Sequence, residues 1–191
     1  ATVRGAGRAG TLFVASTLST KSLEAIAEAS SGPRWYQLYI YRDRDLTASL
    51  VERAEEAGYE ALVLTVDSPV WGRRERDIRN GFTLPDSMGL ANFEDLEQED
   101  LPGGDSGVNG LAEYVSNQLD PSLTWEDVEW LQSLTDLPLL VKGVVDPEDA
   151  RQAQNYGCDG VVVSNHGGRQ LDAGLPKELL SDRVDVSVPV L

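Results

Sequence analysis

The chain has 191 residues, of which 41% are hydrophobic and 25% are charged, and its formal net charge is −16. This length suits a single domain with its own core, and the apolar runs are too short to span a membrane. The strong negative charge argues against nucleic acids and anionic membranes as partners.

Apolar runs alternate with amphipathic stretches along the chain. Strands are predicted at 12–15, 35–40, 61–66, 139–141 and 160–163, and helices at 22–29, 46–57, 125–134 and 146–157. Thr124 is a plausible N-cap, Pro147 suits a first helical position, and Gly58 and Gly157 suit positions just beyond helix ends. Strands that are apolar on both faces and alternate with helices predict a parallel sheet covered by helices.

Two architectures fit this alternation: an open doubly wound sheet and a (β/α)8 barrel. No G-x-G-x-x-G follows the first strand, which weakens the dinucleotide-binding version of the open sheet. The connection at about 68–122 has little regular pattern, and its part 92–110 is rich in Asp, Glu and Gly. We expect it to form a lid or binding loop; the alternative is a disordered segment.

Polar side chains follow each predicted strand, at the edge where parallel α/β folds carry their active sites. Helix capping alone would explain Ser and Thr there, but five consecutive polar strand ends favour a shared site. His166, the only histidine, follows the buried run 160–163, and Arg169 comes three residues later. A base that titrates near neutral pH beside a permanent cation suits chemistry on an anionic substrate. The polar set is Ser16, Gln37, Tyr39, Thr65, Asp67, Lys142, Ser164 and His166.

Five segments carry a family resemblance: WYQLYIY at 35–41, LTVDSP at 64–69, GRRERDIRN at 72–80, LVKGV at 140–144 and SNHGGRQLD at 164–172. In sequence and order they resemble the FMN-dependent α-hydroxy-acid oxidases and dehydrogenases, such as glycolate oxidase, lactate oxidase and flavocytochrome b2. The resemblance implies an α/β fold, a TIM barrel with FMN at its C-terminal mouth. In this pattern residues 1–191 form a partial domain, from barrel strand 2 to the start of strand 7.

The same resemblance assigns the cofactor contacts. Ser16, Gln37, Thr65 and Ser164 would contact the flavin ring. Lys142 would lie beside flavin N1 and O2, where a fixed cation stabilises the reduced form. A surface lysine is the alternative, but Lys142 follows an apolar strand and is one of only three lysines.

The implied reaction is oxidation of an (S)-2-hydroxy acid to the 2-oxo acid. His166 would be the base, either taking the hydroxyl proton during hydride transfer or removing the α-proton to leave a carbanion. Asp67 would orient His166 and stabilise its imidazolium; as an alternative, Asp before Ser-Pro commonly starts a turn.

Four further residues are implied in substrate binding. Arg169 and Arg74 would clamp the substrate carboxylate, although Arg74 could also be one charge in a salt-bridged segment. Tyr39 would offer its hydroxyl to the carboxylate or the reacting oxygen, or else pack at a strand end. Leu18 matches a position that is Trp in glycolate-preferring relatives, so it predicts a lactate-like or longer substrate.

Other functions remain as alternatives: another FMN barrel, such as type 2 isopentenyl diphosphate isomerase or the IMP dehydrogenase group, or an inactive barrel remnant. The family's phosphate-binding Asp-Gly-Gly-x-Arg segment falls beyond Leu191. We therefore expect residues 1–191 alone to bind FMN weakly and to be inactive.

With only one histidine and one cysteine in the chain, we expect no metal site. The electron acceptor (oxygen, a quinone or a cytochrome) stays open, and family members are often homotetramers.

Two features of the composition concern origin and location. Only three of the 16 cations are lysines, and acidic, lysine-poor surfaces occur in proteins adapted to high salt. We favour this halophilic interpretation over an ordinary acidic protein. The single cysteine, Cys158, and the lack of a secretion signal predict a cytoplasmic protein. A start without Met and an end inside the apolar run 186–191 predict a fragment of a larger chain.

Overall fold

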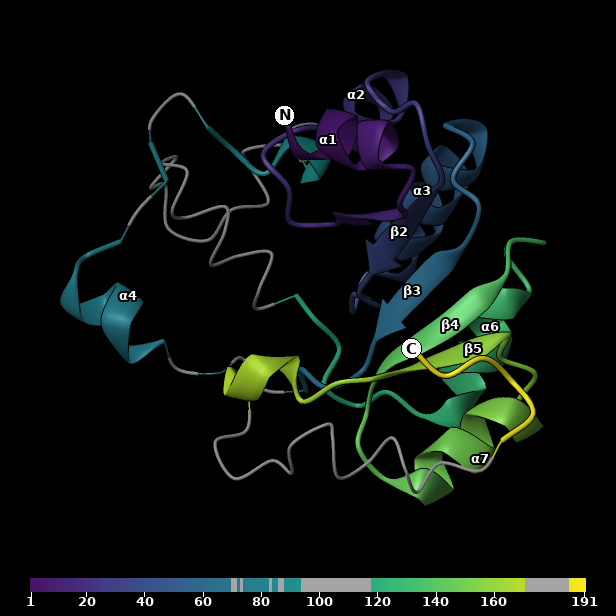
Figure 1. Ribbon diagram of the computed structural model, residues 1–191. Helices are drawn as coiled ribbons and strands as arrows, with labels where there is room; N and C mark the ends of the chain where they lie inside the picture. Colours follow the sequence, from purple (N-terminus) through teal and green to yellow (C-terminus); the bar gives the residue numbers. More distant parts are fainter. Residues whose placement is uncertain (70–71, 73, 83, 86–87, 94–117, 171–185) are drawn as a thin grey trace.

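The centre of the protein is a five-stranded parallel sheet (Figure 1). A computed structural model describes residues 1–69, 72, 74–82, 84–85, 88–93, 118–170 and 186–191. The strands follow one another in chain order, as β1 (Phe13–Ser16), β2 (Arg34–Leu38), β3 (Leu62–Thr65), β4 (Leu139–Val144) and β5 (Gly160–Val163). In a doubly wound sheet the strand order reverses at a switch point. Sequential order is instead the order of neighbouring strands in a (β/α)8 barrel.

The helices connect these strands, as the alternating pattern predicts. They are α1 (Thr2–Ala9), α2 (Leu23–Glu28), α3 (Arg44–Glu56), α4 (Glu75–Arg79), α6 (Trp125–Gln132) and α7 (Pro147–Asn155), with 3-10 turns η1 (Ala91–Phe93) and η3 (His166–Gly168). The starts of α2, α3, α6 and α7 carry side-chain hydrogen bonds. In α7 the Asp146 carboxylate accepts from Glu148 N at 2.8 Å, and in α6 the Thr124 backbone N–H donates to Asp127 Oδ2 at 2.7 Å. Within the described residues, no helix is long and apolar enough to cross a lipid bilayer.

Two helices were not expected from the sequence. α1 contains two glycines and buries only Val3, so its apolar signal is weak. α4 is a charged five-residue helix with no buried residue, and it stands well apart from the sheet in Figure 1. All the expected strands and helices are present, with boundaries that shift by a few residues. The largest shift is in β4, which continues to Val144 instead of ending at Val141.

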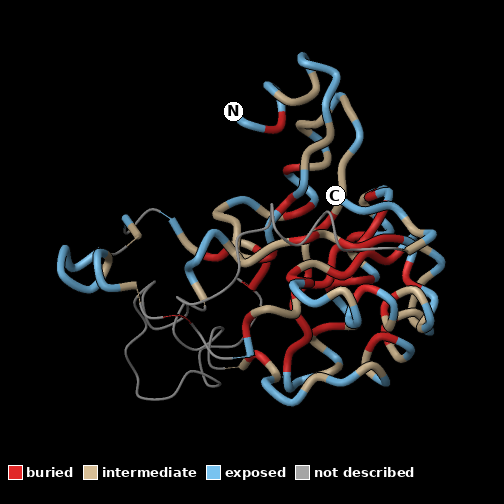
Figure 2. Tube along the Cα trace, turned by 60° about the horizontal axis from the view of Figure 1, so that its bottom comes forward, coloured by how far each residue is buried: buried red, intermediate tan, exposed pale blue. Residues whose placement is uncertain are grey.

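The two faces of the sheet have different surroundings. Tyr36, Leu62 and Val141 belong to the main hydrophobic core, together with Leu50 of α3 and other helical residues. The residues that alternate with them on the strands, among them Trp35, Val63, Leu140 and Val162, form a small separate cluster on the opposite face. Figure 2 shows how burial concentrates in the sheet and the adjoining helix faces. One face therefore packs on helices, and the other is the face that lines the interior of a barrel.

The last described segment extends the sheet beyond β5. Val161 N donates to Pro189 O, and Val163 N donates to Leu191 O, both at 2.9 Å. The bridge between Val161 and Val190 is parallel, and the C-terminus accordingly lies beside β5 (Figure 1). This agrees with the expectation that the chain reaches the start of a seventh barrel strand.

The connection predicted as a lid is described only in part. The buried Asn92 side chain ties η1 to the sheet layer, since its Oδ1 accepts from Leu23 N and its Nδ2 donates to Thr17 O, both at 2.8 Å. Asp120 N donates to Ile40 O at 3.1 Å on the return to the sheet. Residues 94–117, which hold most of the acidic stretch, lie outside the described residues, so the lid stays a prediction.

Candidate active site

Polar side chains from three neighbouring strands form a hydrogen-bonded row at the carboxyl edge of the sheet. The parallel register places Ser16 opposite Gln37 and Thr65 opposite Lys142. Ser16 Oγ donates to Gln37 Oε1 at 3.3 Å, and Gln37 Nε2 donates to Thr65 Oγ1 at 3.0 Å. The structure therefore brings these predicted cofactor contacts together, since parallel strands end at a common edge.

His166 and Asp67 form a close pair at the same edge. Asp67 follows β3 and His166 opens η3 after β5, and His166 Nδ1 lies 2.8 Å from Asp67 Oδ1. Both side chains are mostly buried, at 21% and 12% exposure. A carboxylate only accepts hydrogen bonds, so the neutral imidazole is assigned its proton on Nδ1. Nε2 is then the nitrogen that can take up a proton.

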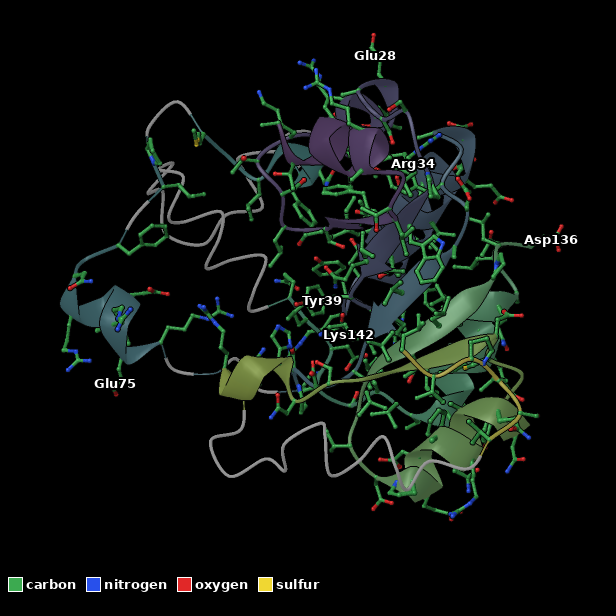
Figure 3. All side chains as sticks on the ribbon, in the orientation of Figure 1. Glu28, Arg34, Tyr39, Glu75, Asp136 and Lys142 are labelled. Atoms are coloured by element: carbon green, nitrogen blue, oxygen red, sulfur yellow. The ribbon has the colours of Figure 1, made fainter. Side chains whose placement is uncertain are left out.

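Lys142 brings a positive charge to the other oxygen of the same carboxylate. Its Nζ lies 3.9 Å from Asp67 Oδ2, and its side chain is 25% exposed. Tyr39 and Lys142, both labelled in Figure 3, lie toward the carboxyl ends of β2 and β4. Asp67 is thus placed between the His166 imidazole and the Lys142 ammonium group.

The backbone at His166 is in the left-handed region, with φ 57°. This conformation costs a non-glycine residue on the order of 1 kcal/mol, and such strain is concentrated at functional sites. The turn is supported from both sides, because Ser164 Oγ accepts from His166 N and Asn165 Oδ1 accepts from Gly167 N, both at 3.0 Å. Ser164 therefore holds the base in place, and its hydroxyl proton can still be donated to a ligand.

Two arginines stand at helix ends in the neighbouring segments, Arg74 before α4 and Arg169 after η3. Burial lowers the pKa of the Arg74 guanidinium, and the charge of Arg169 acts in the same direction. Arg169 also lies 3.8 Å from Asp77. Two guanidinium groups that repel each other in this way favour an anion between them.

The charges of Asp67 and Arg74 both affect the pKa of the Tyr39 phenol. Burial raises the pKa of its phenol, and the charge of Asp67 adds to that effect, while a hydrogen bond with Ser68 and the charge of Arg74 oppose it. The hydroxyl therefore stays protonated at neutral pH and can donate a hydrogen bond.

The Leu18 side chain is half-buried and packs against the main core. This packing explains an apolar residue at this position without any contact to a substrate.

Gln170 is a site residue to which the sequence analysis gave no role. Its Nε2 donates to Ser68 Oγ and its Oε1 accepts from Gly72 N, both at 2.7 Å. Ser68 Oγ in turn donates to Asp67 Oδ1 at 3.4 Å. The amide thus ties the turn that carries His166 and Arg169 to the segment that leads to Arg74. The only sequence signal for a role of Gln170 was its place inside the 164–172 motif. Leu171 and Asp172 of that motif lie outside the described residues.

A cavity of about 500 Å³ borders the cluster but is not its centre. Tyr39, Thr65 and Gly143 contribute to its wall, together with the core residues Leu64 and Val141. Because Leu64 and Val141 face the helices, most of this space lies between the sheet and the helix layer. His166, Arg74 and Arg169 do not line it, so we place the chemistry at the strand ends.

Comparison with known proteins gives a consistent result. The family model for FMN-dependent dehydrogenases matches residues 1–181. An L-lactate oxidase of Nostoc sp. (strain PCC 7120 / SAG 25.82 / UTEX 2576) is 54% identical over 179 residues, which is 92% of this chain and 49% of that protein. Glycolate oxidase 3 of Arabidopsis thaliana is 51% identical over 172 residues, 90% of this chain and 46% of that protein. The chain spans about half the length of the curated relatives it matches.

Solved structures show the same relationship in three dimensions. Mandelate oxidase with (S)-4-hydroxymandelic acid matches with a TM-score of 0.84 at 43% identity, over 98% of this chain and 53% of that chain. A mandelate oxidase variant with (S)-mandelic acid matches with a TM-score of 0.81 at 41% identity, over 98% of this chain and 50% of that one. The five-stranded sheet and its helices are thus part of a TIM barrel.

Proposed function

The chain belongs to the FMN-dependent dehydrogenase family, and from that membership we propose that the protein oxidises an (S)-2-hydroxy acid, lactate-like or longer, to the 2-oxo acid. The observation that carries this proposal is the 2.8 Å contact between His166 Nδ1 and Asp67 Oδ1, together with two arginines, Arg74 and Arg169, close enough for the charge of one to lower the pKa of the other. It supplies a base and a carboxylate-binding region at one strand edge. The relatives reported above are named as oxidases of lactate, glycolate and mandelate, which favours this activity over the isopentenyl diphosphate isomerase alternative.

The residues at the strand ends fit FMN. The polar edge of a flavin ring carries both acceptors and donors, and the row of Ser16, Gln37 and Thr65 offers hydroxyl groups and an amide that can do either. Lys142 and Ser164 would complete the set, with the lysine near the pyrimidine part of the ring. FMN, when bound, supplies the acceptor for the two electrons that leave the substrate carbon.

His166 would take the proton that must leave the substrate during oxidation. With Nδ1 held by Asp67, Nε2 is the atom that receives it, and the carboxylate stabilises the imidazolium that results. Lys142 Nζ lies 3.9 Å from the other carboxylate oxygen, Asp67 Oδ2. The strained backbone of His166 fixes the direction of the ring.

Arg74 and Arg169 would bind the substrate carboxylate. A guanidinium presents paired N–H groups that match the two oxygens of a carboxylate, and two such groups can hold it from different directions. Tyr39 would donate its hydroxyl to the carboxylate or to the reacting oxygen. Leu18 in place of a bulkier residue would leave space for a substrate side chain.

The experiment uses the FMN-loaded full-length protein under anaerobic conditions. Bleaching of the oxidised flavin absorbance is followed after addition of L-lactate, glycolate or (S)-mandelate, with D-lactate as the control of configuration. We expect fast bleaching with L-lactate or (S)-mandelate and slower bleaching with glycolate. Flavin that stays oxidised with every 2-hydroxy acid would refute the activity, and a preference for glycolate would refute the role of Leu18.

The electron acceptor, the oligomeric state and the location of the protein need experiments of their own. Reoxidation by air, by a quinone and by cytochrome c is compared in the same assay, because the sequence leaves the electron acceptor open. We propose a homotetramer, which light scattering of the full-length protein tests. We also propose a cytoplasmic location, which fractionation of the source cells tests.

A further inference from the structure

Strand β4 contains one extra residue at Gly143. Lys142 pairs with Val162 of β5, and Val144 pairs with the next residue, Val163, so the register skips Gly143. A bulge of this kind changes the face on which the following side chains lie. Val144 is accordingly buried in the main core, whereas Lys142 lies on the side of Val162 and reaches toward Asp67.

Gly143 has a backbone conformation and a neighbour that both exclude a side chain. Its φ is +110°, which L residues rarely adopt. A Cβ on Gly143 would lie 2.6 Å from Asp67 Cβ, 2.7 Å from Asp67 Cγ and 2.9 Å from Asp67 N. The bare glycine backbone is therefore a surface against which the Asp67 side chain rests.

Asp67 has little freedom to move away from this surface. Val66 N donates to Lys142 O at 2.9 Å, which holds the backbones of β3 and β4 together just before the two residues. On its other side, the Asp67 carboxylate contacts His166 at 2.8 Å and Ser68 at 3.4 Å. An atom added at Gly143 would have to displace the carboxylate or separate the strands.

We propose that Gly143 is a positioning residue for His166, acting through Asp67. The bulge sets Lys142 and Asp67 relative to each other, and the missing side chain allows the carboxylate to reach Nδ1 of the base. This role rests on the proposed function, because it concerns the rate of the step that His166 assists. If Gly143 were required only for the geometry of the bulge, its replacement would affect folding but not the rate of the step that His166 assists.

Gly157 provides a matched control. It also has a positive φ, of +75°, but a Cβ there would meet only Gln132 Nε2, at an ordinary distance of 3.5 Å. Gly157→Ala therefore introduces an alanine at positive φ away from the strand ends and without a close contact. It separates the general cost of alanine at positive φ from an effect on Asp67.

The test measures anaerobic flavin reduction by L-lactate or (S)-mandelate in the FMN-loaded full-length protein. It compares the parent protein with Gly143→Ala, Gly157→Ala, Asp67→Asn and the double variant Gly143→Ala/Asp67→Asn. We expect Gly143→Ala to slow the limiting reduction rate about 10- to 100-fold, with substrate affinity and flavin content retained. Gly157→Ala should keep the parent rate. In the Asp67→Asn background, Gly143→Ala should slow reduction by less than about threefold, because the carboxylate it displaces is already absent.

Three results would overturn the proposal. Gly143→Ala with the parent rate shows that Asp67 is not displaced, and the proposed function then stands without this role. Effects of Gly143→Ala and Asp67→Asn that multiply show that glycine acts independently of the carboxylate. A parent protein that binds FMN but is reduced by no 2-hydroxy acid overturns the proposed function, and this role with it.

A further double variant covers the case in which Gly143→Ala does not fold. Gly143→Ala/Asp67→Gly removes the two side-chain atoms that the new methyl group would meet and leaves only the 2.9 Å approach to Asp67 N. We expect this double variant to regain part of the soluble, flavin-binding protein, and no gain over Gly143→Ala would contradict the side-chain contact.

Discussion

Asp67 and His166 lie 99 positions apart in the chain, yet Asp67 Oδ1 is 2.8 Å from His166 Nδ1. The contact joins the end of β3 to the turn after β5, across the intervening strand β4. β4 contributes Lys142, which approaches the other oxygen of the same carboxylate. Segments at the ends of three consecutive strands thus bring together an imidazole, a carboxylate and an ammonium group.

Replacement of Asp67 by Asn should slow flavin reduction about 10²- to 10⁴-fold, because the amide no longer offsets the charge of the imidazolium. Stopped-flow absorbance of the FMN-loaded protein measures the rate. Asp136→Asn is the control, since this carboxylate is exposed and points away from the protein in Figure 3. Equal rates for the two variants would contradict the role of Asp67.

Replacement of Arg169 by Lys should weaken substrate binding more than it slows the limiting rate. Lysine keeps the charge but loses the paired N–H groups, and we expect the substrate concentration at half-saturation to rise about 10-fold or more. Arg151→Lys is the control, because Arg151 is half exposed and pairs with Glu148 on α7. An unchanged half-saturation in Arg169→Lys would rule out a clamp at this residue.

Replacement of Gln170 by Ala removes two hydrogen bonds of the His166 turn, one to Ser68 Oγ and one from Gly72 N. We expect catalytic efficiency to fall about 10-fold, in line with about 1.4 kcal/mol for the lost contacts, with flavin content unchanged. Steady-state kinetics measure this loss. Gln132→Ala, which removes one hydrogen bond to Gly157 O, should leave efficiency as it is, and an equal loss in both variants would exclude a specific link.

Stability should fall at alkaline pH through Cys158. Burial raises the pKa of this thiol from its ordinary value of 9.0 to about 12, and the charge of Asp159 adds to the effect. Above pH 9 the unfolded chain loses this proton while the folded protein keeps it, so the free energy of unfolding decreases as pH rises toward 12. The slope is at most about 1.4 kcal/mol per pH unit.

Urea unfolding at pH 8 and pH 10 measures this contribution. Cys158→Ala should lose about 1 kcal/mol less than the parent protein over that interval, because alanine has no proton to release. The buried tyrosines are present in both proteins and cancel in the comparison. Identical pH dependence in the two proteins would show that the thiol is not protected by burial.

The sheet and the meeting of the strand ends could be predicted from the sequence because both depend on local patterns. Apolar runs and helix caps define each element, and parallel strands bring Gln37 and Thr65 to one edge whatever the details of packing. The link between Gln170 and Gly72 could not be predicted in this way, since it depends on how two turns approach in space. The bulge at Gly143 could not be predicted either, because the apolar run ends at Val141 and only the register of β4 with β5 shows the extra residue.

The central claim is that His166 acts as the base in the oxidation of a 2-hydroxy acid. The most direct measurement compares His166→Gln with the parent protein in anaerobic flavin reduction by L-lactate and (S)-mandelate, with both proteins fully loaded with FMN. We predict that His166→Gln keeps its flavin but is reduced about 10²- to 10⁴-fold more slowly. Reduction of His166→Gln at the parent rate would contradict the claim.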